Sequence, residues 1–143
     1  MKQILKNLIF AVAFITGFSS IAQTKIDSLI QKIDNKDVYL IFAQKMSPRI
    51  SGSFGSEMVS IGKKATPELI KILDDHNKGI AAHVILSKIY NWEEPICCDV
   101  MSDGRIEIVF LNGLKIHIEN NNLSATAEDL KANKAKWKQY TET

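Results

Sequence analysis

The stretch that decides the fold is 57-EMVSIGKKATPELIKILDDHNKGIAAHVILSKIY-90, whose apolar pattern predicts two helices with a break between them. Thr66 suits the N-cap of the first helix. Pro67 suits its first helical position, where the missing N–H is not needed. The residues DDHNKG (74–79) interrupt the apolar stripe and separate this helix from the next. The stretch therefore predicts a helix, a turn and a second helix.

The second of these helices is predicted over residues 80–90 and is apolar on nearly every side. Only His83 and Ser87 form a polar stripe along it. A helix this apolar needs neighbours on more than one side, because a surface helix keeps a broad polar face. We therefore expect other elements to pack around it.

The small and apolar positions of residues 57–90 resemble the consensus of a HEAT or HEAT-like (armadillo-type) helical repeat. The matching positions are Ile61-Gly62, Ala65, Pro67, Leu69-Ile70, Leu73, Asp75, Ala81-Ala82, Leu86 and Ile89. Gly79-Ile80 stands where the family usually has Val-Arg. A fainter copy precedes it, because LIQKIDNKD (29–37) aligns with LIKILDDHN (69–77) at an offset of 40 residues, about the HEAT period. The resemblance implies stacked antiparallel helix pairs and contact with other proteins.

The region before this stretch is also predicted to be mainly helical. Apolar residues recur at helical spacing over residues 26–33, and a second apolar stretch over residues 38–46 is closed by Pro48. The glycine- and serine-rich segment SGSFGS (51–56) is interpreted as a solvated connector between two helical pairs, with a ligand-cradling loop as the alternative. Residues 23–91 are thus predicted to form the HEAT-like part. Because stacked repeats need three or more units, another element must complete the core.

Residues 95–120 predict a three-stranded antiparallel β-meander, because apolar and polar side chains alternate along them. A two-residue turn at 112–113 pairs Ile108 with His117, which mixes the two faces. A three-residue loop (111–113) keeps the apolar residues on one face. We therefore predict this loop, with the cross-strand pairs Phe110–Leu114, Ile108–Ile116 and Ile106–Ile118.

Two adjacent cysteines, Cys97 and Cys98, lie on the first of these strands. A turn over residues 102–104 predicts the pairs Val100–Ile106, Cys98–Ile108 and Ile96–Phe110. Because successive side chains of a strand point to opposite faces, we expect Cys98 in the core and Cys97 on the outer face beside Val109. A vicinal or intermolecular disulfide is one alternative. Catalytic or metal chemistry is another, although no CxxC or HxxxH spacing occurs.

The C-terminal segment predicts a last helix over residues 126–141. Thr126 and Asp129 have the spacing of a capping box. The apolar stripe of this helix consists of Leu130 and Trp137, with Tyr140 close to it. We expect that stripe to dock on the sheet or on the preceding helices.

The N-terminus has the three parts of a signal peptide. They are a positive head at Lys2 and Lys6, an apolar run over residues 8–18, and small residues at Ser20 and Ala22. We predict cleavage after Ala22, which removes residues 1–22 and leaves a single domain over residues 23–143 in the periplasm or outside the cell. A buried N-terminal helix is the alternative.

The predicted mature chain carries no net side-chain charge. Of the 18 Lys and Arg residues, Lys2 and Lys6 leave with the signal peptide, so 16 remain against 16 Asp and Glu. A neutral surface without a Lys/Arg cluster offers no electrostatic footprint for nucleic acid. We expect no nucleic-acid partner and no membrane span in the mature chain.

The sequence shows no catalytic or cofactor signature of the P-loop, GxSxG, HExxH or dinucleotide type. His76 is predicted in a turn, His83 on a helix and His117 on a strand, and each is interpreted as a structural or solvated residue. The segment WEEP (92–95) places two carboxylates together in what we interpret as a solvated turn. We therefore assign no catalytic, metal-binding or cofactor-binding residue and no cofactor, and enzymatic activity stays open.

Together these patterns predict an α+β fold in which HEAT-like antiparallel helix pairs are followed by a three-stranded antiparallel β-meander and a C-terminal helix. The resemblance implies a protein-interaction module that binds another protein or a peptide through its helical surface or an open sheet edge. A small secreted or periplasmic enzyme is one alternative, and it predicts a deep pocket holding two or more of the polar residues above. An immunity- or inhibitor-type binding protein with a charged face is the other.

Overall fold

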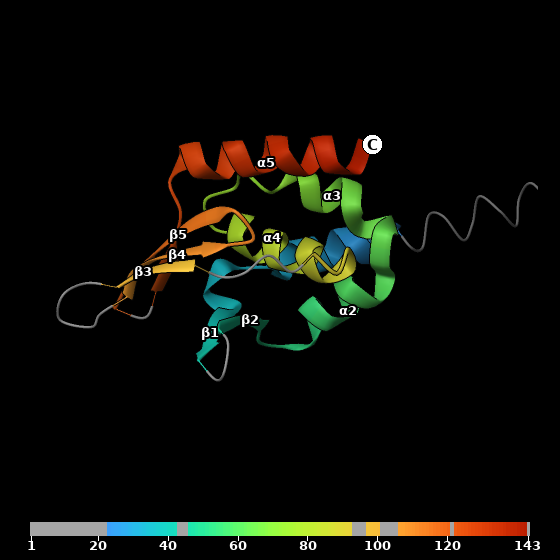
Figure 1. Ribbon diagram of the computed structural model, residues 1–143. Coiled ribbons are helices and arrows are strands. Elements are labelled where there is room, and N and C mark those ends of the chain that lie inside the picture. The colour runs from blue at the N-terminus through green and yellow to red at the C-terminus, as the bar shows by residue number, and fades with distance from the viewer. Residues whose placement is uncertain (1–22, 43–45, 93–96, 101–105, 121, 143) are drawn as a thin grey trace, which may run out of the picture.

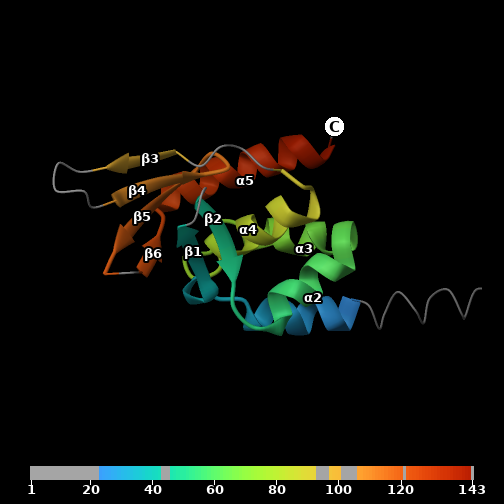
Figure 2. The same cartoon turned by 60° about the horizontal axis from the view of Figure 1, so that its bottom comes forward.

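The computed structural model describes residues 23–142, apart from 43–45, 93–96, 101–105 and 121, and it has the predicted α+β fold. α4 (Gly79–Ile89) runs through the middle of the molecule. α5 (Ala127–Glu142) covers one side of it, and α2 (Ser53–Ile61) lies on the other side (Figure 1). The signal peptide predicted over residues 1–22 lies outside the described residues. The helix over residues 23–32 lies beside α2 (Figure 2).

α4 is the predicted second helix of the deciding stretch. Every residue from Gly79 to Ser87 is buried, so the expected neighbours on more than one side are confirmed. The predicted polar stripe at His83 and Ser87 is wrong, because both residues are buried and hydrogen-bonded inside the protein. Burial of these polar groups is tolerated because their atoms have partners.

The start of α4 explains two positions at which the chain departs from the HEAT consensus. A Cβ atom on Gly79 would overlap the backbone carbonyl of Leu73, so no larger residue is accommodated without a shift. Ile80 is fully buried in the hydrophobic core. An arginine there would place an unpaired charge in the core. Gly79-Ile80 therefore reflects the tight packing of this turn.

α3 (Thr66–Lys71) begins differently from the prediction. The 3-10 helix η2 (Gly62–Ala65) runs directly into it, and no side chain caps it. Thr66 is the first residue of α3 and not its N-cap, and its hydroxyl oxygen lies 3.2 Å from the Tyr90 hydroxyl oxygen. Pro67 is the second residue of α3, so it lies in the first turn but one position later than predicted. Continuity with η2 replaces the side-chain cap, because the preceding turn is already helical.

Residues 38–42 and 46–50 form two paired strands and not the predicted helix ending at Pro48. β1 (Val38–Phe42) pairs with β2 (Met46–Ile50) in antiparallel register. β-branched and aromatic residues dominate β1 and favour a strand, and burial alternates along it. The proline is tolerated because a two-stranded sheet leaves open edges, where no ladder bond is lost. The predicted connector over residues 51–56 is also too long, because α2 begins after its first two residues.

The predicted β-meander is present and gains a fourth strand. The sheet has the order β3–β4–β5–β6 with antiparallel neighbours. Its strands are β3 (Cys97–Val100), β4 (Ile106–Leu111), β5 (Leu114–Glu119) and β6 (Asn122–Ser124). β6 is an edge strand, and it faces the start of the β1–β2 hairpin (Figure 2).

The β4–β5 hairpin turns at Asn112-Gly113, so the predicted three-residue loop is wrong. Leu111 pairs with Leu114, and Ile108 pairs with His117. Asn112 has a φ of 46° and Gly113 a φ of 81°. Two consecutive positive φ angles are the requirement of the type I′ turn, whose twist matches that of the flanking strands. The conformational preference of Asn-Gly therefore sets this register.

The new register also changes which face of β4 enters the core. The buried residues are Val109, Leu111, Leu114 and Ile116, whereas Ile106, Ile108 and Phe110 are only half-buried. Both faces of β4 are apolar, so alternation could not decide between them. A shift of one residue exchanges the two faces of a strand.

The cysteine-bearing strand β3 is also displaced from its predicted register. Cys98 lies opposite Val109, where the prediction placed Ile108. An irregularity before Val100 then restores the predicted partner of that residue at the end of the strand. The predicted burial of Cys98 and exposure of Cys97 concern side chains outside the described part of the chain.

α5 is the predicted C-terminal helix, and its capping box is confirmed. The Thr126 hydroxyl lies 2.6 Å from a carboxylate oxygen of Asp129, and its oxygen accepts the Asp129 backbone N–H at 3.1 Å. Leu130 and Trp137 are fully buried, so the predicted stripe does dock. The helix packs on β5 and α3.

Candidate functional site

Two surface regions gather polar or aromatic side chains, and they lie at opposite ends of α4. The first is a polar hollow at its N-terminal end, between η1 (Asn35–Asp37), the turn before α4 and β6. The second is a row of aromatic rings at its C-terminal end, formed by residues after α4 and by α5. The two regions use their side chains differently.

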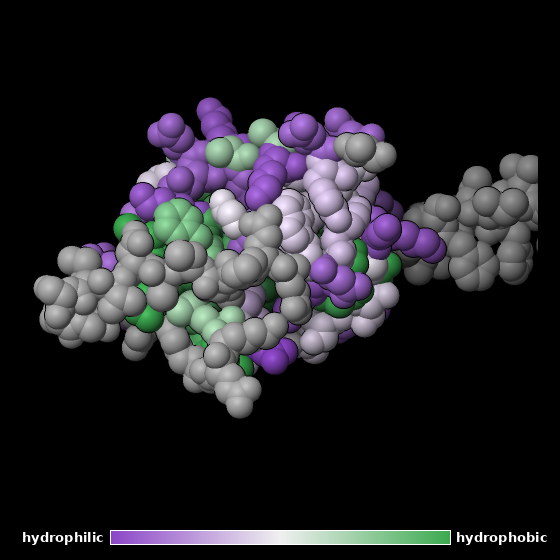
Figure 3. Space-filling model, in the orientation of Figure 1, coloured by the Kyte–Doolittle hydropathy of each residue, from purple (hydrophilic) through white to green (hydrophobic). Residues whose placement is uncertain are grey.

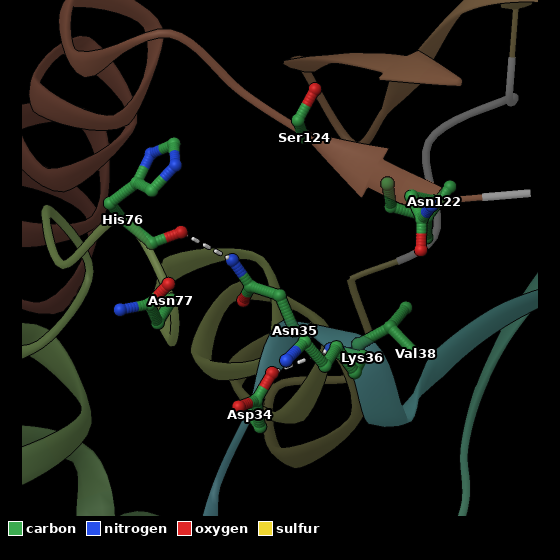
Figure 4. A pocket seen from close by; sticks show the side chains of 9 residues that line it. Asp34, Asn35, Lys36, Val38, His76, Asn77, Asn122 and Ser124 are labelled. Carbon is green, nitrogen blue, oxygen red and sulfur yellow. Dashed lines mark hydrogen bonds between the residues drawn. The ribbon is translucent and has the colours of Figure 1, made fainter. Parts of the chain in front are cut away.

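The polar hollow has a volume of about 230 Å³. Figure 4 shows Asn35 between the turn that carries His76 and the β6 side of the hollow. The polar side chains that line the hollow belong to Asp34, Lys36, His76, Asn77, Asn122 and Ser124. It is smaller than the pockets that enclose drug-sized ligands.

Asn35 is buried at the floor of the hollow, where it caps α4 from a distant part of the chain. Its Oδ1 atom accepts the backbone N–H groups of Ile80 at 2.9 Å and Ala81 at 3.0 Å. Its Nδ2 atom donates to the His76 carbonyl at 2.8 Å, and its backbone N–H donates to the Asn77 carbonyl at 2.6 Å. The first N–H groups of a helix have no partner within it, so this side chain satisfies two of them. The Asn35 side-chain amide therefore has a structural role.

The remaining groups of the hollow include another structural cap. A carboxylate oxygen of Asp34 accepts the backbone N–H of Lys36 at 2.9 Å, which caps η1. Of the three histidines, His76 lines the hollow, whereas His83 lies in the core and His117 on β5. Within the described residues, no three His, Cys, Asp or Glu side chains converge to hold a metal ion.

His83 is fully buried and joins three elements through its ring. Trp137 Nε1–H donates to His83 Nδ1 at 2.9 Å, and His83 Nε2 lies 2.8 Å from the Leu111 carbonyl oxygen. An indole N–H can only donate, so Nδ1 is the acceptor. The ring proton then lies on Nε2 and is donated to Leu111. One neutral tautomer of His83 therefore ties α4 to α5 and β4.

Trp137 is the buried centre of an aromatic cluster. Its ring centroid lies 5.7 Å from that of Tyr90, 4.9 Å from that of Trp92 and 5.7 Å from that of Tyr140. These tilted and edge-to-face arrangements are the favourable geometries of aromatic pairs. The buried ring thus supports three rings that lie farther out.

The outer rings form a row with a lysine at each end, which we call the aromatic strip: Lys63, Tyr90, Tyr140, Trp92 and Lys136. Lys63 Nζ lies 5.1 Å from the Tyr90 ring centroid, and Tyr90 meets Tyr140 at 5.6 Å. Tyr140 stacks on Trp92 at 4.7 Å with an interplanar angle of 27°. Lys136 Nζ lies 4.7 Å from the Trp92 ring centroid. Tyr140 remains 46% exposed although it contacts three other rings.

At one end of the aromatic strip Lys63 lies over Tyr90, and the exposed Lys64 follows it in the sequence. Neither Lys63 nor Lys64 forms an ion pair within the described part of the chain. At the other end of α4, Lys134 of α5 donates to Asp74 of the α3–α4 turn at 2.7 Å, and this hydrogen bond lowers the pKa of Asp74. α5 presents a mostly hydrophilic outer surface (Figure 3). The strip therefore combines apolar rings with cations at its ends.

The sequence had signals for this strip that motif searches do not use. Trp92 is the first residue of WEEP, whose two glutamates lie outside the described residues. Trp137 is predicted on the apolar stripe of the last helix, with Tyr140 close to it, but their contacts with Tyr90 and Trp92 depend on tertiary packing. The available signal was the pair of aromatic residues after each of two helices' apolar stretches: Tyr90 and Trp92, and Trp137 and Tyr140.

Comparisons with known proteins found no match: no protein-family model, no curated protein and no solved structure resembles this chain. The HEAT-like resemblance therefore stays a prediction that rests on the residues themselves. In the part of the chain that the structure describes, no helix has the length and apolar character needed to cross a bilayer.

Proposed function

We propose that this chain is an exported protein-interaction module of HEAT-like type that binds a protein or peptide partner through the aromatic strip. The observation that carries this proposal is the stacked pair of Tyr140 and Trp92, with Tyr140 46% exposed and a lysine beside Trp92. Tyrosine and tryptophan are enriched among the residues that dominate binding energies at interfaces. An exposed, ordered aromatic pair supports a contact surface.

The support beneath the strip favours binding because it holds the rings in one arrangement. Trp137 contacts the three outer rings and is itself fixed by its hydrogen bond to His83. A surface that is already ordered loses less conformational entropy when a partner binds. The strip is therefore pre-organised for a contact.

The enzyme alternative predicts a deep pocket with two or more of the polar residues singled out in the sequence. Among the described residues of that set, His76 alone lines the polar hollow. No observation favours the enzyme over the interaction module, so the proposal stays with binding.

A comparison of two matched tyrosine variants tests the proposal. Tyr140→Ala removes the exposed ring of the strip, whereas Tyr39→Ala removes a ring on β1 that is 48% exposed against 46% for Tyr140. Each protein, purified after expression of the full chain, is immobilised and used to capture partners from the exported fraction of the source organism. Bound proteins are identified and quantified by mass spectrometry.

We expect a stoichiometric partner on the wild-type protein and on Tyr39→Ala, and loss of that partner on Tyr140→Ala. Circular dichroism and thermal unfolding show whether both variants remain folded. Absence of any stoichiometric partner on the wild-type protein would sink the proposed function. Equal capture of the partner by Tyr140→Ala and the wild-type protein would show that the aromatic strip is not the binding surface.

A further inference from the structure

We propose that α5 undocks as a unit from the folded body of the protein, and that the buried amide of Asn133 makes this opening easier. The undocked helix takes Tyr140 away from Tyr90 and Trp92, so the aromatic strip is a surface that the protein can take apart. The opening can be measured without a partner. Only its consequence for binding rests on the proposed function.

Asn133 lies in the middle of the face by which α5 contacts the rest of the protein. It follows Leu130 by three positions and precedes Trp137 by four, a spacing that places the three side chains on one side of the helix. These three are the buried residues of α5. Neither Nδ2 nor Oδ1 of Asn133 has a hydrogen-bond partner within the described part of the chain. The contact therefore contains an unsatisfied amide.

An unsatisfied buried amide favours the undocked state. Water can hydrogen-bond both atoms of the group once α5 has left the body, whereas the docked state keeps them without a partner. Burial of Leu130 and Trp137 and the Trp137–His83 hydrogen bond act in the opposite direction and keep the docked state the major one. A desolvation penalty of this kind shifts the docking equilibrium by about fivefold or more toward opening.

The rest of the protein keeps most of its core when α5 leaves. Leu130 and Trp137 are the members of the hydrophobic cluster that α5 supplies, and all other members precede α5 in the sequence. Every residue of α4 from Gly79 to Ser87 is buried, whereas α5 runs along the outside of the molecule (Figure 1). Elements with few buried apolar contacts open at a lower free energy than the whole protein. We therefore expect α5 to open before the body unfolds.

The aromatic strip is assembled across the contact between α5 and the residues after α4. Tyr140 and Trp137 come from α5, and each of them contacts both Tyr90 and Trp92. Undocking therefore separates the rings into two groups. A partner that contacts both groups binds only the docked state, so its binding stabilises the docked helix.

Native-state hydrogen exchange tests this inference. Backbone amides of α4 and α5 are followed by NMR without a partner, at several urea concentrations below the unfolding transition. The proteins are the wild type, Asn133→Leu and the control Ala132→Leu, which places the same new side chain at an exposed position of the same helix. Asn133→Ala is a second variant that removes the amide without adding volume. Each protein is purified after expression of the full chain, and circular dichroism shows whether it is folded.

The α5 amides of the wild type should exchange together, through an opening at least about tenfold more populated than the one that releases the α4 amides. This opening should depend less on urea than global unfolding, because it exposes less surface. Asn133→Leu should slow α5 exchange at least about fivefold, which is more than the roughly threefold that helix propensity alone supplies. Asn133→Ala should also slow it, and Ala132→Leu should change it less than about twofold.

Three results would overturn the inference. If the α5 amides exchanged only together with the α4 amides, at the same rate and with the same urea dependence, α5 would not open by itself. If α5 opened separately but Asn133→Leu did not slow it, the amide would not set the opening. Loss of folding in both Asn133 variants would show that the amide is needed.

These results are independent of the proposed function. Each of them would leave partner capture through Tyr140 unchanged. Absence of a partner in the capture experiment would refute the proposed function and leave the opening of α5 in place.

Discussion

The polar hollow and the aromatic strip lie at the two ends of α4 and differ in what their side chains do. At the hollow, both amide atoms of Asn35 are bonded to the backbone, so the polar group that lines the floor holds the helix start in place. At the strip, the outer rings are held in place by buried residues beneath them, Trp137 and His83. Tyr140 can therefore remain exposed and still be ordered.

This difference shows why concavity alone is a poor guide to function in this chain. The hollow exists because two sheets and a turn meet around a long-range helix cap, and its buried polar atoms already have partners. In the strip, the Tyr90 hydroxyl lies 3.2 Å from the Thr66 hydroxyl oxygen, whereas Tyr140 remains 46% exposed. If the hollow is part of the scaffold and the strip is a contact surface, substitutions in the two regions should have different effects.

The largest effect is expected at the centre of the aromatic cluster. Trp137→Ala removes a fully buried ring that contacts three others, and a loss of about 3–5 kcal/mol in the free energy of unfolding follows from the cavity it leaves. Trp137→Phe keeps a ring but leaves His83 Nδ1 without its donor, at a cost of about 1–3 kcal/mol. Urea denaturation measures both. If Trp137→Ala lost less than Trp137→Phe, the central role of this ring would be refuted.

The next largest effect is expected at the floor of the hollow. Asn35→Ala removes the acceptor of two helix N–H groups and one donor to a carbonyl, so stability should fall by about 2–3 kcal/mol. Asn77→Ala is the matched control, because its exposed side chain lines the same hollow, and it should change stability by less than about 0.5 kcal/mol. Denaturant unfolding distinguishes the two. Equal effects would mean that the cap does not hold α4.

A stabilising change is expected between the two regions, at Asn133 on α5. Its side chain is buried at 4% exposure, and neither its Nδ2 nor its Oδ1 has a hydrogen-bond partner within the described part of the chain. Asn133→Leu keeps the branching of the side chain at Cγ and removes the unsatisfied amide, so stability should rise by about 1–2 kcal/mol. Thermal unfolding checks the sign. A lower melting temperature would reveal a partner for this amide.

The smallest effect is expected for the ion pair that joins α5 to the turn before α4. The hydrogen bond from Lys134 lowers the pKa of Asp74 below its ordinary value of 3.8. A carboxyl group with a lowered folded-state pKa stabilises the protein above its unfolded-state pKa, and this stability is lost as the pH falls through the folded-state pKa. Because the pair is exposed, its contribution is at most about 0.5–1 kcal/mol.

Asp74→Asn should therefore be less stable than the wild type at pH 6, and the difference should shrink toward zero at pH 2–3, as measured by urea denaturation across this pH range. A difference that grew on acidification would have the wrong sign for a carboxylate held in its charged form by Lys134.

The helices α4 and α5 could be predicted from the sequence because each of them follows from local signals. The apolar residues of α4 required burial on all sides, and Thr126 with Asp129 marked the start of α5. These signals concern residues a few positions apart. Distant residues could not be found in this way: Asn35 caps α4 across a sequence separation of 45 residues.

The alternation of apolar and polar residues could not settle the structure of the hairpins. β4 is apolar on both faces, so the choice of register depended on the turn, and Asn112-Gly113 adopts the positive φ angles of a type I′ turn. Residues 38–46 are apolar without a helical period, and their strand propensity was the better guide. The strip could not be assembled from the sequence for the same reason as the cap, because Tyr90 and Trp92 lie far along the chain from Tyr140.

The most direct test of the central claim is a comparison of partner binding by two stable surface variants. Tyr140→Ala alters the aromatic strip, and His76→Ala/Ser124→Ala alters the exposed lining of the hollow. With the partner captured by the wild-type protein, isothermal titration calorimetry should show loss of binding for Tyr140→Ala and an unchanged Kd for the hollow variant. Full binding by Tyr140→Ala with loss in His76→Ala/Ser124→Ala would contradict the account and make the hollow the functional site.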